Sequence, residues 1–104
     1  MAKIKLTLGP LPDFKLPVSF VMPDGNEQQI IFTVKHKPAS EVQEMYKKEG
    51  IKDADFIMLL ATDWDVEDEF NKENAARLVD YYPGAALALM SAYLGALAGQ
   101  RVKN

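Results

Sequence analysis

The sequence predicts an α+β fold in which an N-terminal antiparallel β-hairpin is followed by about four α-helices, so that the chain is mostly helical. Apolar residues alternate in the first third of the chain, a proline and glycine turn interrupts them, and helical spacing follows. The 104 residues, 48% of them hydrophobic, suffice for one domain with one core. We expect a single domain over residues 1–104, with an extended arm (1–13), a β-hairpin (14–35) and a helical part (40–100).

The arm is predicted from Gly9-Pro10-Leu11-Pro12. Proline lacks an amide donor and restricts the residue before it to extended conformations, so this stretch favours neither a helix nor a central strand. We therefore expect a lead-in segment outside the core.

The hairpin is predicted from alternation that begins at Phe14. Pro23-Asp24-Gly25-Asn26 is a turn signal, because proline presets the first turn dihedral and glycine or asparagine accepts the left-handed positions. Residues 29–35 return as a strand rich in β-branched residues. The shared apolar face comprises Phe14, Leu16, Val18, Phe20, Met22, Ile30, Phe32 and Val34. Since two strands alone are marginal in water, the hairpin must pack on helices.

Two helices are predicted over residues 40–64. Ser40 and Gln43 have the spacing of a capping box, and Gly50 is placed to end the first helix. The apolar face of this helix comprises Val42, Met45 and Tyr46. Asp53 is the candidate cap of the second helix. Its apolar stripe comprises Phe56, Ile57, Leu60 and Trp64.

The segment Asp63–Glu69 holds five acids in seven residues, which favours a solvated connector or the first turn of a helix. Asn71 is the candidate cap of a third helix. One face of that helix carries Ala75, Leu78, Val79 and Tyr82. Pro83 cannot continue a helix without losing a hydrogen bond but suits the first position of the next one, so two helices should meet there.

The final helix, from Pro83 to about Gln100, is apolar on nearly every side. One stripe comprises Leu87, Met90, Leu94 and Leu97, and alanines cover much of the rest. A helix that is apolar all round must be buried, and a chain of this length has barely enough protein to surround it. We therefore expect part of its surface to contact another chain, which predicts self-association.

No catalytic, cofactor or metal site is predicted. Asp63, Asp65 and Glu67 alternate as at the start of an EF-hand loop, but Asp68 stands where the loop needs glycine and Asn74 where it needs glutamate. The single histidine has lysines as neighbours, and the absence of cysteine excludes thiol chemistry and disulfides. We therefore do not expect an enzyme.

Charge and hydropathy also exclude two classes of partner. The net charge is −3, and residues 1–52 hold eight basic and six acidic residues, whereas residues 53–104 hold four and nine. Because no large basic cluster exists, nucleic-acid binding is not expected. The most apolar segment, Ala85–Ala98, is shorter than the roughly 18 to 20 residues that cross a bilayer, and no secretory signal is evident, so neither a membrane span nor export is expected.

Several motifs follow one another in a set order along most of the chain. They are Pro23-Asp24-Gly25, Phe32-Thr33-Val34-Lys35-His36, a helix start at Ser40, Trp64-Asp65, Tyr82-Pro83, Tyr93, and the tail Arg101 to Asn104. In this order they resemble the phage tail assembly chaperones of long-tailed bacteriophages and prophages. The resemblance is to the short form of these proteins, which is translated without a ribosomal frameshift.

The resemblance implies a protein that binds the tape measure protein, keeps it soluble and helps recruit tail tube subunits. It implies action in the host bacterial cytoplasm and absence from the mature virion. In many relatives a longer product arises by ribosomal frameshifting, and such a product would contact the tail tube protein. The alternative is a small structural tail or head-completion protein of the virion.

Partner binding is expected at the apolar final helix and at the segment from Trp64 to Phe70. Several copies are expected to assemble along one tape measure chain. The candidate partner-binding residues are Trp64, Phe70, Tyr82, Met90, Tyr93, Leu94 and Leu97.

Overall fold

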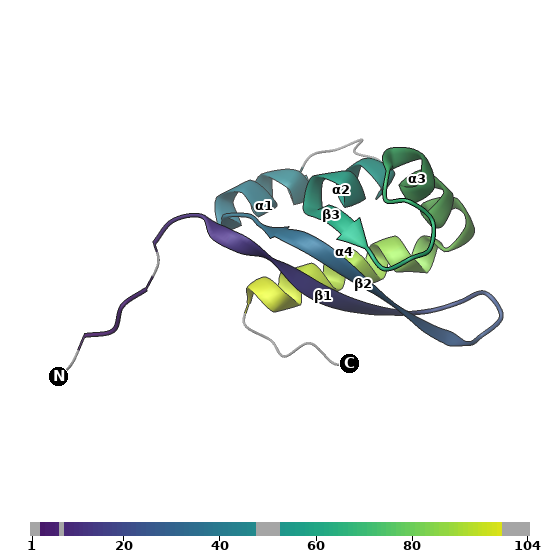
Figure 1. Cartoon of the computed structure of the whole chain (residues 1–104), viewed down its shortest axis with the longest axis horizontal. Coiled ribbons are helices and arrows are strands. Elements are labelled where there is room, and N and C mark those ends of the chain that lie inside the picture. The colour runs from purple at the N-terminus through teal and green to yellow at the C-terminus, as the bar shows by residue number, and fades with distance from the viewer. Residues whose placement is uncertain (1–2, 7, 48–52, 99–104) are drawn as a thin grey trace.

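The computed structural model describes residues 3–6, 8–47 and 53–98 (Figure 1). The elements, in chain order, are β1 (Leu11–Val21), β2 (Glu27–His36), α1 (Ala39–Lys47), α2 (Asp53–Leu60), β3 (Ala61–Trp64), α3 (Lys72–Tyr81) and α4 (Pro83–Leu97). The predicted α+β class, a hairpin followed by four helices, is confirmed, and a short third strand is added.

The hairpin forms where the sequence predicts it. β1 and β2 pair antiparallel, and Gly25 takes a φ of 90°, the left-handed region that glycine allows at the turn. The amide of Gly25 donates to the carbonyl of Met22 at 2.8 Å, which closes the turn. The alternating apolar residues face the core and are buried: Leu16, Val18, Phe20, Ile30, Phe32 and Val34.

The boundary of the predicted arm is wrong by three residues. β1 begins at Leu11, which pairs with His36 at the far end of β2, and the register shifts between Leu11 and Phe14. Pro12 is tolerated here because it lies at this register shift, near the start of an edge strand, where proline is accommodated. Residues 3–6 and 8–10 carry no regular secondary structure.

The second helix does not continue to Trp64, contrary to the sequence prediction. α2 ends at Leu60, and β3 pairs antiparallel with β2, giving the strand order β1-β2-β3. Trp64 lies opposite Phe32 in this pairing, with the two ring centroids 6.2 Å apart in an edge-to-face arrangement. Residues 61–64 therefore pair with β2 and do not extend α2 by another turn. This pairing places the Trp64 ring on the core.

The helix boundaries follow local capping chemistry, with one exception. The side chain of Asn71 accepts a hydrogen bond from the amide of Asn74 at 2.8 Å, as predicted for the start of α3, and Pro83 is the first residue of α4. The capping box at Ser40 is wrong: α1 begins at Ala39, and the Pro38 carbonyl accepts the first helical hydrogen bonds. Asp53 is the first residue of α2, and Gly50, the predicted end of the first helix, lies outside the described residues.

The helices cover one face of the sheet, and the core lies between them (Figure 1). α4 packs against β1, α2 and α3. The largest fully buried side chains come from both layers: Leu16, Phe32, Phe56, Ile57, Leu60, Leu89 and Tyr93. Among the helices that the structure describes, none has the length and apolar character that crossing a membrane requires.

Candidate functional site

α4 turns one apolar face inward and leaves another exposed. Its buried residues are Ala85, Ala86, Leu89 and Tyr93. The small alanines allow the helix backbone to come close to its neighbours. Of the predicted stripe, Met90 and Leu97 pack against the edge of the core, whereas Leu87 and Leu94 lie outside it. The side chains of Leu87 and Leu94 are 65% and 45% exposed, and Met90 and Leu97 are half-buried.

We call Leu87, Met90, Leu94 and Leu97 the outer stripe of α4. Steps of three, four and three residues separate them, which is the spacing of the apolar seam in a coiled coil. Two leucines exposed in one such seam form a surface suited to an apolar helix of another chain.

Tyr93 is a core residue that aligns α4 with the sheet. Its ring is fully buried and stacks beside Phe14, with the centroids 6.3 Å apart. The hydroxyl donates to the carbonyl of Lys35 at 2.7 Å and accepts from the amide of Lys37 at 3.1 Å. Burial raises the pKa of the Tyr93 phenol. As folded, this residue holds the end of β2 against α4 and presents no surface to a partner.

Trp64 anchors the connector between β3 and α3 (residues 65–71). The indole is buried and lies edge-to-face with Phe70, with the centroids 5.1 Å apart. Its Nε1 donates to the carbonyl of Asp68 at 2.7 Å. These contacts fold the acidic connector back onto the core, so Trp64 contributes more to stability than to the exposed surface.

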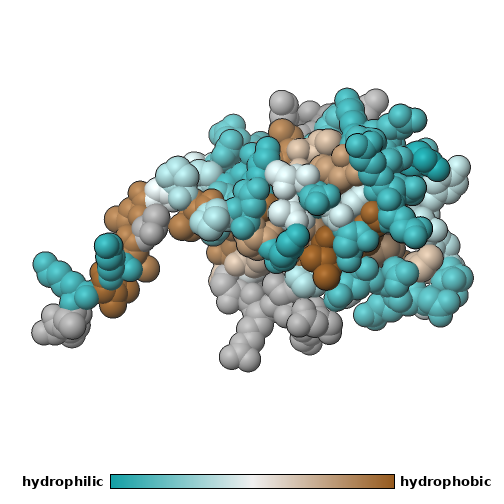
Figure 2. Space-filling view, in the orientation of Figure 1, coloured by the Kyte–Doolittle hydropathy of each residue, from teal (hydrophilic) through white to brown (hydrophobic). Residues whose placement is uncertain are grey.

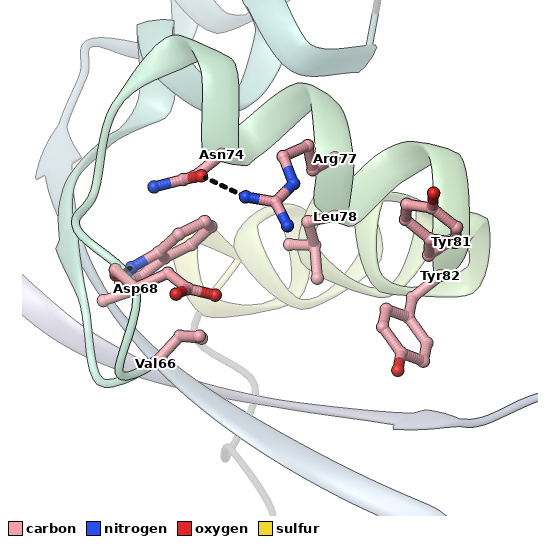
Figure 3. A pocket seen from close by; sticks show the side chains of 8 residues that line it. Val66, Asp68, Asn74, Arg77, Leu78, Tyr81 and Tyr82 are labelled. Atoms are coloured by element: carbon pink, nitrogen blue, oxygen red, sulfur yellow. Dashed lines mark hydrogen bonds between the residues drawn. The ribbon is translucent and has the colours of Figure 1, made fainter.

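A small hollow of about 150 Å³ lies between the connector and α3 (Figure 3). Its lining residues are Trp64, Val66, Asp68, Asn74, Arg77, Leu78, Tyr81 and Tyr82. In Figure 3 the Arg77 side chain reaches toward Asn74, to whose side-chain oxygen it donates at 3.3 Å. Small-molecule sites usually measure roughly 300 to 1,000 Å³, so this hollow suits a single side chain of a partner. The described residues include no group of three or more histidines or acids placed to hold a metal ion.

The structure separates the candidate partner-binding residues into two groups. Met90, Leu94 and Leu97 lie on the outer stripe of α4, whereas Trp64 and Tyr82 line the hollow and Phe70 packs on Trp64. Tyr93 belongs to neither group. The candidate set omitted Leu87, which the spacing of the stripe identifies. It also omitted Tyr81, which is of a residue type enriched in binding hot spots, and Arg77, for which the sequence carries no comparable signal.

Tyr46 joins α1 to α4 and makes stability sensitive to alkaline pH. Its hydroxyl donates to the carbonyl of Met90 at 2.9 Å, and burial raises the pKa of the phenol from 10.0 to about 12. Because the folded state holds this proton more tightly than the unfolded state, the contribution is complete below pH 10.0 and is lost as the pH rises toward about 12. We expect urea midpoints to fall over that range. Tyr46→Phe should lower the midpoint at neutral pH but flatten the alkaline decline; an equally steep decline in the variant would contradict this account.

Comparison with known proteins relates the chain to a family. A family model described as phage tail assembly chaperone matches residues 1–104. No curated protein and no solved structure matches the chain significantly.

Proposed function

The chain belongs to the phage tail assembly chaperone family, and on that premise we propose that it binds the tape measure protein, keeps it soluble and helps recruit tail tube subunits. As a member of this family the chain is not an enzyme. The observation that supports the proposal best is the exposed outer stripe of α4.

The outer stripe gives the proposal a binding mode. A tape measure protein is long and largely helical, with apolar stripes that must be covered until tube subunits surround it. A helix of that protein would lie along α4, with its apolar side chains between Leu87, Met90, Leu94 and Leu97. The hollow beside Tyr82 offers a second contact for one side chain of the same client.

The size of the outer stripe sets the strength of this contact. Complete burial of a leucine contributes about 1.5 to 3 kcal/mol, and Leu87 and Leu94 are already partly covered in the monomer. The two side chains together therefore contribute about 2 to 3 kcal/mol, which corresponds to roughly 30- to 150-fold in affinity. A single copy would bind weakly, so coverage of a long client needs several copies, and each can be displaced by a tube subunit.

We further propose that the tail tube protein is a second partner, reached through a longer frameshifted product. The chain would act in the cytoplasm of the host bacterium during assembly and be absent from the mature virion. A small structural role in the virion is the alternative, and detection of the chain in purified particles would favour it.

Co-expression tests the proposal. The chain is expressed together with the tape measure protein of the same phage, and the soluble fraction and the co-purifying fraction of that protein are measured. We expect the tape measure protein to be soluble and bound in the presence of the chain and insoluble in its absence. An insoluble tape measure protein that does not associate with the chain would refute the proposal.

A further inference from the structure

The arm (residues 3–6 and 8–10) projects from one end of the molecule and exposes apolar side chains (Figures 1 and 2). Ile4, Leu6 and Leu8 are 80%, 66% and 93% exposed. Lys3 and Lys5 alternate with them, so an extended arm would carry leucine and isoleucine on one side and positive charge on the other. Three large apolar residues exposed together suggest a segment that is covered by a binding surface.

A groove of about 370 Å³ lies at the opposite end of the sheet, near the hairpin turn, as its lining residues Phe20, Met22 and Gln28 show. Its apolar lining comprises Phe20, Met22, Ile30, Val66, Leu78 and Tyr82. Its acidic lining comprises Asp65, Glu67 and Asp68, and none of the lysines and arginines in the described part of the chain lines it. We call this the acid-rimmed groove. Its apolar and negative character is complementary to the apolar and positive character of the arm.

An open strand edge runs beside the acid-rimmed groove. β3 pairs with β2 only between Phe32 and Val34, and the next outward amide, that of Ile31, donates to the carboxylate of Asp65 at 2.9 Å. Backbone groups alternate in direction along a strand, so the amide and carbonyl of Gln29 also point to this side. Within the described residues, no strand pairs with Gln29 there.

The other edge of the sheet is a poorer site for strand addition. Pro17 lies opposite Ile31 in the β1–β2 pairing. Because the amide of Ile31 points away from β1, the corresponding position of Pro17 points away from β2, toward the open edge of β1. Proline has no hydrogen to donate there, so the middle of that edge cannot form a regular ladder.

We propose that the arm of one copy lies in the acid-rimmed groove of a second copy, with its backbone beside β2. Ile4, Leu6 and Leu8 would cover the apolar lining, and Lys3 and Lys5 would face the acidic rim. Strand hydrogen bonds to Gln29 would fix the arm along the edge.

The length of the chain excludes the complete contact, with Leu8 in the groove, within one copy. β1 separates the base of the arm from the hairpin turn by ten residue steps, or about 33 Å from Leu11 to Val21. Leu8 is three residues from Leu11 and can reach about 11 Å at most. Each copy therefore offers one arm and one groove to other copies. Reciprocal exchange of arms would give a dimer, and a head-to-tail contact would give a ring where the rotation closes and an open chain where it does not.

The first experiment measures self-association of the full chain without any client, by sedimentation velocity up to about 100 µM, a range that detects weak contacts. We expect concentration-dependent oligomers of the unmodified chain. Leu6→Asp and Leu8→Asp, at positions exposed in the monomer, should each weaken association by about tenfold or more. Leu59→Asp, at an exposed position of α2, is the matched control and should associate normally. A monomeric unmodified chain, or arm variants that associate normally, would overturn the proposal.

A charge exchange tests the pairing of arm and groove. Lys5→Glu and Glu67→Lys should each weaken association by roughly two- to fivefold, and the chain carrying both changes should recover. Lys47→Glu, at an exposed position of α1, is the control. Equal weakening by the double variant and the singles would contradict the pairing.

A labelled peptide with the sequence of residues 1–10 locates the site on the full-length Leu6→Asp, Leu8→Asp chain. We expect its binding to shift the amide signals of Val66, Leu78 and Gln29 in nuclear magnetic resonance spectra. Shifts confined to the outer stripe of α4 would overturn the assignment. Because no tape measure protein is present in any of these experiments, their failure would leave the proposed client binding untouched.

Discussion

Replacement of Leu94 by arginine is expected to abolish co-purification with the tape measure protein and leave the fold intact. Leu94 is 45% exposed at the middle of the outer stripe of α4, so a long charged side chain can extend into solvent in the free monomer. In the complex the same guanidinium would be buried against an apolar helix without a partner, which costs several kcal/mol. Repeated over several copies on one client, that penalty should reduce binding below detection.

Leu59→Arg is the matched control, because Leu59 is 40% exposed and belongs to α2, not to the outer stripe of α4. Both variants should keep the circular dichroism spectrum and urea midpoint of the unmodified chain, and only Leu94→Arg should lose the client in a pull-down. Unchanged client binding in Leu94→Arg would remove α4 from the interface.

Trp64→Ala should cause a large loss of stability. The indole packs on Phe32 and Phe70 and holds the connector through the carbonyl of Asp68. Removal of a buried aromatic ring costs about 3 to 5 kcal/mol, a large share of the roughly 5 to 15 kcal/mol that stabilises a domain. Urea unfolding followed by circular dichroism measures the change without a tryptophan signal.

Trp64→Phe separates the ring from its hydrogen bond. It keeps an aromatic ring against Phe32 but removes the donor to Asp68, so it should cost less than Trp64→Ala. If Trp64 acted mainly as a partner contact, Trp64→Ala would lose client binding at nearly unchanged stability, contrary to the expectation.

The parts of the fold that the sequence predicts well depend on chemistry within a few residues. Alternation from Phe14 predicts the hairpin, and Gly25, Asn71 and Pro83 predict a turn, a helix start and a helix junction, because each determines its own backbone geometry. Ser40 misleads because the preceding Pro38 offers its backbone carbonyl to the same helix end.

β3 could not be predicted, because its pairing partner is distant in the sequence. Four residues are too few to show alternation, and Trp64 also fits the helical spacing set by Phe56 and Leu60. Whether this segment continues the helix or forms a strand depends on β2, whose side near Phe32 is free to pair with it. Phe32 lies about thirty residues earlier in the sequence, so the two segments meet only in the folded chain.

The sequence predicts that α4 carries an apolar candidate surface, but it does not predict which side of the helix is exposed. α4 is apolar on several sides, so its spacing identifies the stripe from Leu87 to Leu97 but not the side that faces the core. The alanine side of α4 is buried because small side chains let the helix pack closely against its neighbours. Tyr93 is buried on the same side, where its hydroxyl makes hydrogen bonds to two backbone groups. Arg77 and Tyr81 became neighbours of the connector only through the packing of α3.

Pro17 has a consequence for the behaviour of this protein at high concentration. β1 is an eleven-residue edge strand, long enough to nucleate the stacking of further chains into insoluble β-aggregates. Pro17, at the middle of that edge, has no amide hydrogen, so a strand added there could form regular hydrogen bonds over only a few residues. The chain is thereby protected from aggregation through this strand edge.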